Sequence, residues 1–285
     1  TRLRHRLTVE NRVQLRWETF AFEAIDLIEE SVNGPLTPSI AFNDLTSMSM
    51  RAFDVPVQDR VFEQSPAYPL ADLDDPRLKT RWASSAVRAG MEIDAYLARA
   101  RTVWGRREDV SAALARVAAA GRAAGAPMLS HDATQVETRA YYRALGATIA
   151  EFPMVMAPTQ DARDAGDFIV FGAPNAVRGG SHIGSLGAGD MVEAGLCDAL
   201  ASDYFYPAML AAIARLDQER RAPRHALWSL VSAGPAAASG LTDRGVIAPG
   251  KRADLVLVDW PDGGVPAVRL TLVAGRTAYW AEPAG

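Results

Sequence analysis

Residues 168–203 read FIVFGAPNAVRGGSHIGSLGAGDMVEAGLCDALASD, and this stretch decides the fold. It begins with an apolar run at 168–171, which predicts a buried strand. A turn-rich polar segment (172–184), a helix over about 186–195 and a second apolar run ending at Asp203 follow. The order strand, polar loop, helix, strand is typical of α/β proteins, which place their chemistry at the carboxyl ends of buried parallel strands.

The rest of the chain repeats this alternation. Strands are predicted at residues 3–9, 39–42, 127–130 and 147–150. Helices are predicted at residues 10–30, 76–101, 108–124, 134–145, 157–165, 206–216 and 225–233. About six strand–helix alternations indicate a parallel sheet with right-handed crossovers. A (β/α) barrel and an open doubly wound sheet both fit, although no glycine-rich dinucleotide or phosphate-binding signature follows any strand.

Two segments lie outside this alternation. Residues 47–76 show no clear period and predict a long excursion over one face, of the kind that often acts as a lid. From residue 245 the texture changes, and apolar alternation at 254–258 and 267–273 predicts strands. The C-terminal residues are therefore expected to form a small β appendage.

Length and composition set broad limits. The 285 residues, 49% hydrophobic and 22% charged, suit one large α/β domain plus an appendage. A net charge of −4 argues against nucleic acid or an anionic membrane as the main partner. Cys197 is the only cysteine, so no internal disulfide can form. With no membrane-length apolar run and no visible signal peptide, we expect a cytoplasmic protein, and the start inside a strand at Thr1 suggests a fragment.

His131 and Asp203 are the main candidates for chemistry, because each ends a predicted strand. Imidazole and carboxylate at strand ends suit a divalent metal in a barrel mouth, and an Asp can accept the proton of a metal-bound water. A histidine that is only hydrogen-bonded at the strand end is an equal alternative for His131. His182 lies in a glycine-rich loop that suits either solvent or an anion. Glu151 and Asp44 also end strands, where capping is the simpler role.

Three runs resemble a known family: residues 127–153 (PMLSHDATQVETRAYYRALGATIAEFP), 171–188 (FGAPNAVRGGSHIGSLGA) and 197–210 (CDALASDYFYPAML). They are similar to the triphosphate diphosphatases of the carbon–phosphorus lyase pathway, a branch of the metal-dependent amidohydrolase superfamily. Residues 240–260 (GLTDRGVIAPGKRADLVLVDW) look like the C-terminal segment of many amidohydrolases. The first three runs are specific to the branch, and the last only to the superfamily.

The resemblance implies a (β/α)8 TIM-type barrel lacking its N-terminal strands over residues 1–240, with a small C-terminal β-sandwich segment over 241–285. It implies a metal-dependent hydrolase that cleaves a phosphoanhydride of a phosphorylated ribose phosphonate, with zinc as the expected divalent metal. Expected partners are a small phosphorylated substrate, neither nucleic acid nor membrane, with a homo-oligomer left open. The implied site residues are His131 and Asp203 for metal, Asp203 for catalysis, and Asn175, Arg178, Ser181 and His182 for substrate.

The chain departs from the family at four places, one of which is Ser185, where the family often has an asparagine. The superfamily's His-x-His pair has no match. The family's Leu-Arg-Cys-Glu run is matched to residues 3–6, which puts Arg6 where a glutamate is expected. Its Met-Asp-His-Thr run is matched to residues 43–46, with Leu45 in place of the histidine. Because a guanidinium cannot bind a metal, Arg6 argues against a two-metal site. A diverged pseudoenzyme or ligand-binding barrel without a complete metal site, and a hydrolase with a new substrate, are therefore the alternatives.

Overall fold

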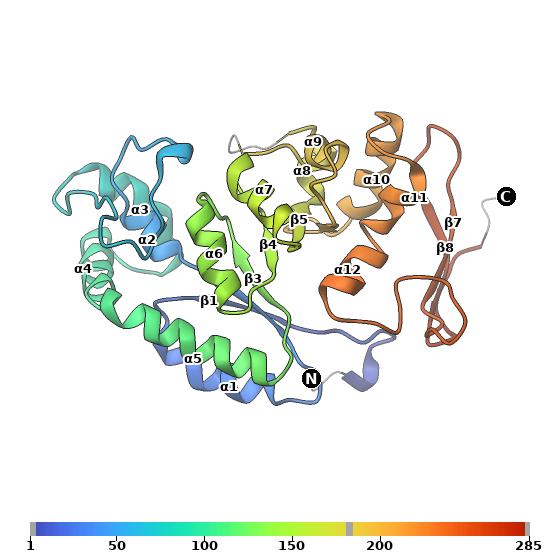
Figure 1. Cartoon of the computed structure of the whole chain (residues 1–285), viewed down its shortest axis with the longest axis horizontal. Helices are drawn as coiled ribbons and strands as arrows, with labels where there is room; N and C mark the ends of the chain where they lie inside the picture. The colour runs from blue at the N-terminus through green and yellow to red at the C-terminus, as the bar shows by residue number, and fades with distance from the viewer. Residues whose placement is uncertain (1–3, 181–184, 283–285) are drawn as a thin grey trace. The chain divides into compact units, whose positions relative to one another are not determined.

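The computed structural model describes residues 4–180 and 185–282, and the chain divides into two compact units. Gln14–Thr148 form one, called here the 14–148 unit. Thr1–Val13 and Ile149–Gly285 form the other, called here the C-terminal unit. In Figure 1 the 14–148 unit runs from blue to green, and most of the C-terminal unit runs from yellow-green to red. Each unit has parallel strands and an apolar core of its own.

The 14–148 unit is built on three parallel strands. They are β1 (Gln14–Glu18), β2 (Ser39–Asn43) and β3 (Met128–His131). The strands pair in this order, with Glu18 beside Asn43 and Phe42 beside Ser130. The helices are α1 (Ile25–Val32), α2 (Leu45–Met50), α3 (Arg77–Arg88), α4 (Ile93–Trp104), α5 (Val110–Ala123) and α6 (Val136–Ala144).

One face of these strands packs against helices. Trp17 of β1 and Tyr142 of α6 both contact the ring of Phe42 on β2, with centroid separations of 6.1 and 5.5 Å. Helices α1 and α5 lie side by side against the same core (Figure 1), which includes the fully buried Leu114. Each such apolar side chain contributes about 1.5–3 kcal/mol on burial. Side chains alternate along a strand. Arg16 and Glu18, the neighbours of Trp17 on β1, therefore lie on the opposite face.

The C-terminal unit repeats this plan. Its parallel strands are β4 (Ile149–Glu151), β5 (Phe168–Gly172) and β6 (Ala199–Ala201). Its helices are α7 (Met156–Asp164), α8 (Ala173–Arg178), α9 (Ala188–Glu193), α10 (Ala208–Gln218), α11 (Arg224–Ser229) and α12 (Ala233–Ala238). Ile169 and Phe171 of β5 are buried in one core with Ile213 of α10 and Leu227 of α11. The two predicted strands of this segment and the predicted helix before the second strand are confirmed.

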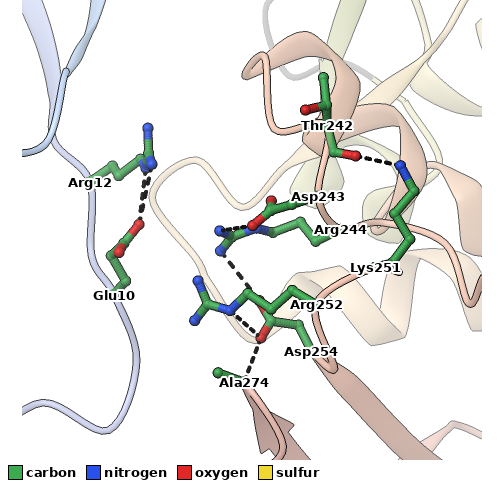
Figure 2. A network of polar contacts seen from close by, with 9 residues as sticks. All are labelled: Glu10, Arg12, Thr242, Asp243, Arg244, Lys251, Arg252, Asp254 and Ala274. Atoms are coloured by element: carbon green, nitrogen blue, oxygen red, sulfur yellow. Dashed lines mark hydrogen bonds and ion pairs between the residues drawn. The ribbon is translucent and has the colours of Figure 1, made fainter. Parts of the chain in front are cut away.

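The predicted C-terminal β appendage is also confirmed. It is an antiparallel sheet of β7 (Leu255–Asp259), β8 (Ala267–Val273) and β9 (Arg276–Trp280), of which the last was not predicted. Figure 2 shows the polar network at its base, where Arg244 contacts Asp243 at 2.8 Å and Asp254 at 3.2 Å. Asp254 also pairs with Arg252 and accepts the backbone N–H of Ala274, each at 2.8 Å. These contacts hold the approach to β7 against the turn between β8 and β9.

Several predicted elements are wrong. Arg4–Arg6 form a single 3-10 turn instead of a strand. The helix predicted at 10–30 is β1 followed by α1, because residues 14–18 alternate with the two-residue period of a strand. The helix predicted at 76–101 is divided into α3 and α4, since Gly90 adopts a left-handed φ of 64° that ends the first helix.

Two smaller predictions also fail. The turn-rich segment after β5 contains α8, which begins with Pro174 in its first turn, a position that suits proline. The capping box predicted at Thr134 does not form, because α6 begins one residue later with Gln135 at its N-cap and no side-chain hydrogen bond there.

No helix in the described part of the chain is long and apolar enough to cross a membrane. A barrel over residues 1–240 stays a prediction.

Candidate functional site

Three polar side chains lie in a row at the carboxyl ends of β1, β2 and β3. Glu18 is the register partner of Asn43, and extending the β2–β3 register by one residue brings His131 beside Asn43. Paired residues of parallel strands point to the same face, so this row lies opposite the apolar core. Asn43 Nδ2 lies 3.5 Å from Glu18 Oε2, and Arg16 donates to Asn43 Oδ1 at 3.4 Å. The position predicted for His131, at a strand end, is confirmed.

Glu18 is the residue of this row that sequence reasoning missed. Residues 15–18 read Leu-Arg-Trp-Glu and end at the carboxyl end of β1. The match of the family's Leu-Arg-Cys-Glu run to residues 3–6 is therefore wrong, since Arg6 is exposed in a 3-10 turn that ends no strand. The usable signal was residues 15–18, which match the pattern at three of its four positions and keep its glutamate, with Trp17 in place of the cysteine. It was hidden by the helix predicted there.

Glu18 and Asp44 together hold the first turn of α2. The backbone N–H groups of Leu45 and Thr46 donate to the Glu18 carboxylate at 3.0 and 3.1 Å. Asp44 Oδ1 accepts the backbone N–H of Ser47 at 2.8 Å, as an N-cap residue does. Burial, with repulsion by Asp44, raises the pKa of Glu18 to about 7. A carboxyl that titrates near neutral pH can both give and take a proton.

A further carboxyl, which is buried, comes from the long excursion after α2. Glu63 is 6% exposed and accepts a hydrogen bond from Thr138 Oγ1 at 3.0 Å. Burial raises its pKa to about 7. The side chain of Gln64 donates to Asp44 at 2.9 Å, and Arg107 donates to the carbonyl oxygen of Glu63 at 2.6 Å. The segment predicted to act as a lid is thus anchored to the start of α2 and to α6.

His131 has a carboxylate neighbour of its own. Its side chain is 6% exposed, and Nδ1 lies 2.8 Å from Oδ2 of Asp132. In metal sites, a carboxylate commonly orients a histidine ligand by accepting a hydrogen bond from it. The contact between His131 Nδ1 and Asp132 is close but does not have hydrogen-bond geometry. Asp132 has a left-handed φ of 57°, and so do Phe152 and Asp203 (55° and 51°), each of which closely follows a strand. Such strained positions gather at functional sites.

Asp203 stands two residues beyond β6 in the C-terminal unit, and its side chain is exposed. A Cβ atom added to Gly172 would lie 3.8 Å from Asp203 Oδ2, so this carboxylate lies over the end of β5. Arg178, the last residue of α8, places its guanidinium 5.7 Å from the ring centroid of Tyr204. The predicted pair Asp203 and Arg178 therefore lies around the carboxyl ends of β5 and β6.

The other predicted substrate residues divide into two groups. Asn175 accepts the backbone N–H of Ala188 at 2.8 Å and donates to the carbonyl oxygen of Leu186 at 3.3 Å. Its amide therefore ties α8 to the start of α9. Ser181 and His182 lie outside the described residues. The substrate-binding role of all these residues stays a prediction.

The described residues do not by themselves fit a metal site. Among residues 4–180 and 185–282, no group of three or more His, Cys, Asp or Glu side chains could hold a metal ion. His131 and Glu18 have suitable chemistry, but the Glu18 carboxylate already accepts two backbone N–H groups. Two ligands are fewer than the three or four protein ligands of zinc sites. Zinc binding by His131 and Asp203, which lie in different units, stays a prediction.

Comparison with known proteins gives one close relative. Over 151 residues the chain is 41% identical to the alpha-D-ribose 1-methylphosphonate 5-triphosphate diphosphatase of Escherichia coli (strain K12). The matched part is 52% of this chain and 40% of that protein, so the chain spans less than half of its relative's length.

Solved structures and a family model extend the comparison. A 5-methylcytosine deaminase from Klebsiella pneumoniae, liganded with 5-fluorocytosine, matches with a TM-score of 0.50 and 12% identity, over 96% of this chain and 72% of that chain. An amidohydrolase from Thermotoga maritima MSB8 matches with a TM-score of 0.42 and 16% identity, over 72% and 53%. The deaminase match shows a shared fold alone. The model of the Amidohydrolase family matches residues 37–279. Since this match takes in most of the sequence, the chain belongs to the amidohydrolase family, as its resemblance predicted.

Proposed function

We propose that this chain is a hydrolase of the amidohydrolase type that cleaves a phosphoanhydride of a phosphorylated ribose phosphonate. The observation that carries the proposal is the 41% identity, over 151 residues, to a protein named as a diphosphatase of such a triphosphate. Family membership supports hydrolysis as the reaction class. The substrate is inferred from that relative, of which the chain matches 40%.

The proposed roles follow from position and chemistry. Asp203, an exposed carboxylate at the end of β6, accepts the proton of the attacking water. Asn175, Arg178, Ser181 and His182 contact the substrate. Zinc is the metal that the resemblance implies, but the described residues do not by themselves fit it, so the proposed roles do not depend on a metal. Glu18, whose pKa is about 7, is suited to exchange a proton with the leaving diphosphate near neutral pH.

A barrel that binds a ligand without turnover is the second candidate. One observation favours it: the carboxylates of Glu18 and Asp44 both accept backbone N–H groups at the start of α2. This is the bonding expected of residues that stabilise a helix terminus. A chain that binds the phosphonate triphosphate but does not hydrolyse it would support this alternative.

The test is hydrolysis of α-D-ribose 1-methylphosphonate 5-triphosphate, followed by release of diphosphate with and without added zinc. We expect turnover by the wild type and none by Asp203→Asn, with an unchanged circular dichroism spectrum. Asp262→Asn is the matched control, because this fully exposed carboxylate belongs to the same unit and pairs with Arg224. Equal turnover by Asp203→Asn and the wild type would remove Asp203 from the mechanism. Substrate binding by a wild type that never turns over would replace hydrolase by ligand-binding barrel.

A further inference from the structure

A pocket of about 560 Å³ opens in the 14–148 unit next to the row of strand-end residues. Its lining comes from the ends of β1 and β2 and from α2, α3 and α4. It includes Glu18 and Asn43, so the pocket and the row share two side chains. The volume lies within the range of small-molecule sites. A substrate held here would therefore lie against the residues with the strongest candidate chemistry in this unit.

The pocket is lined by three arginines. They are Arg16 on β1 and Arg81 and Arg88 on α3. Arg16 donates to the amide oxygen of Asn43 at 3.4 Å, and Arg88 donates to the hydroxyl of Ser85 at 2.9 Å. In the described part of the chain, neither of these two guanidinium groups is paired with a carboxylate. Arg116, by contrast, is held by Asp26 and Glu29 on the outer surface.

Arg81 adds positive charge that the fold keeps in place. Its guanidinium lies 3.7 Å from the ring centroid of Phe53 and donates to the carbonyl oxygens of Ser49 and Arg51. These contacts hold the side chain without neutralising it, since carbonyl oxygens and a ring carry no net charge. Arg81 therefore contributes a positioned charge to the pocket.

The rest of the lining suits an anion as well. The hydroxyls of Thr46, Ser49 and Ser85 can donate hydrogen bonds. Glu18 is the one acidic side chain of the lining, against three arginines, although the whole chain carries a net charge of −4. Its carboxylate accepts two backbone N–H groups, and its pKa of about 7 lowers its negative charge at neutral pH. The pocket is thus locally positive on an acidic protein.

We propose that this pocket binds the oligophosphate end of an anionic substrate, with Arg16 and Arg88 as the side chains that contact phosphate oxygens. A guanidinium matches phosphate with two parallel hydrogen bonds, and such charge-assisted bonds are among the strong ones. Naming the substrate as a phosphonate triphosphate rests on the proposed function, whereas oligophosphate binding by the pocket does not. Glu18 and Asn43, at the strand ends, would then face a phosphoanhydride of the bound oligophosphate.

The test is calorimetric titration of the whole protein with inorganic tripolyphosphate, and with orthophosphate as the short probe. We expect one site for tripolyphosphate, weaker binding of orthophosphate, and loss of affinity with added salt. Arg88→Gln should weaken tripolyphosphate binding about tenfold or more, because the variant loses the charge-assisted hydrogen bonds of the guanidinium. The double variant Arg16→Gln/Arg88→Gln should weaken it further. Arg276→Gln on β9 is the matched control, because this exposed arginine belongs to the other unit.

Some results would overturn the inference. These are no tripolyphosphate binding, equal binding of both probes, or equal affinity of Arg88→Gln and Arg276→Gln when both have the melting temperature of the wild type. The proposed function fails separately from it. If the wild type hydrolyses no triphosphate while Arg88→Gln loses tripolyphosphate binding, that result would support the binding pocket and refute the hydrolase. Hydrolysis with an unchanged KM in Arg88→Gln keeps the hydrolase and refutes the pocket.

Discussion

Replacing Glu63 with glutamine should make the stability of the 14–148 unit less dependent on pH. Glu63 is 6% exposed, and its carboxylate accepts a hydrogen bond from Thr138. Burial raises its pKa from 4.5 to about 7, with repulsion by Asp44 in the same direction and attraction by Arg60 in the other. Glutamine keeps an acceptor oxygen for Thr138 but has no proton to release. The variant therefore isolates the cost of ionising one buried carboxyl.

The direction in which stability changes with pH follows from which state, folded or unfolded, binds the proton. Between pH 4.5 and about 7 the folded protein keeps the Glu63 proton that the unfolded chain has released. The folded state then binds more protons, so this group's contribution to stability is complete below pH 4.5 and falls as the pH rises to about 7. At about 1.4 kcal/mol for each pH unit of that interval, the loss is about 3 kcal/mol. Between about pH 5 and pH 8, the free energy of unfolding of Glu63→Gln should therefore fall by about 3 kcal/mol less than that of the wild type.

Urea unfolding followed by tryptophan fluorescence would measure this difference, since Trp17, Trp82 and Trp104 belong to the same unit. Glu137→Gln is the control, because it makes the same change at an exposed carboxyl of α6, next to Thr138. The control should keep the pH dependence of the wild type. If Glu63→Gln keeps it too, burial does not hold the Glu63 carboxyl in its protonated form and the reasoning is refuted.

Two stability predictions can be checked by the same urea unfolding. Leu114→Ala should lower the free energy of unfolding by about 2–5 kcal/mol, because this fully buried side chain leaves a cavity; Leu27→Ala, at a side chain that is 64% exposed on α1, should cost far less. Gly234→Ala should cost about 1–3 kcal/mol or more, because the new Cβ would lie 1.8 Å from the carbonyl oxygen of Asp198. Gly105→Ala, where the nearest atom is 3.4 Å away, should be nearly neutral. Equal losses within either pair would contradict the packing argument.

Strand ends were predictable where an apolar run meets a polar or small residue at once. This holds for the strands that end at Asn43, His131, Glu151 and Gly172. It fails for β1, because residues 10–30 carry apolar side chains at spacings that also suit a helix. Residues 14–18 form a strand and not a helix because they pair with β2, whose residues are 25 positions away in the chain. Strand propensity depends on such packing more than helix propensity does.

The buried carboxyl groups could not be predicted from the sequence. Glu63 and its hydrogen-bond donor Thr138 are 75 residues apart, and Glu18 accepts from backbone groups 27 and 28 residues later. Nothing local to either glutamate indicates burial, and burial is the main cause that raises both pKa values. The arginine-lined pocket is hidden in the sequence for the same reason, since β1 and α3 supply its charges from distant segments.

The position of one glutamate decides how the two candidate functions compare. With Arg6 in the family's Leu-Arg-Cys-Glu pattern, a guanidinium would replace an acidic side chain, and the ligand-binding barrel would gain support. Residues that act in a barrel mouth stand at the carboxyl ends of strands. Glu18 does so on β1, in register with Asn43, while Arg6 lies exposed in a 3-10 turn. The acidic group is therefore kept, and the two matched runs differ from the family's at Trp17, Asn43 and Leu45, of which Leu45 is 48% exposed. This balance favours a hydrolase, because an acidic side chain stands at the carboxyl end of β1 in register with Asn43.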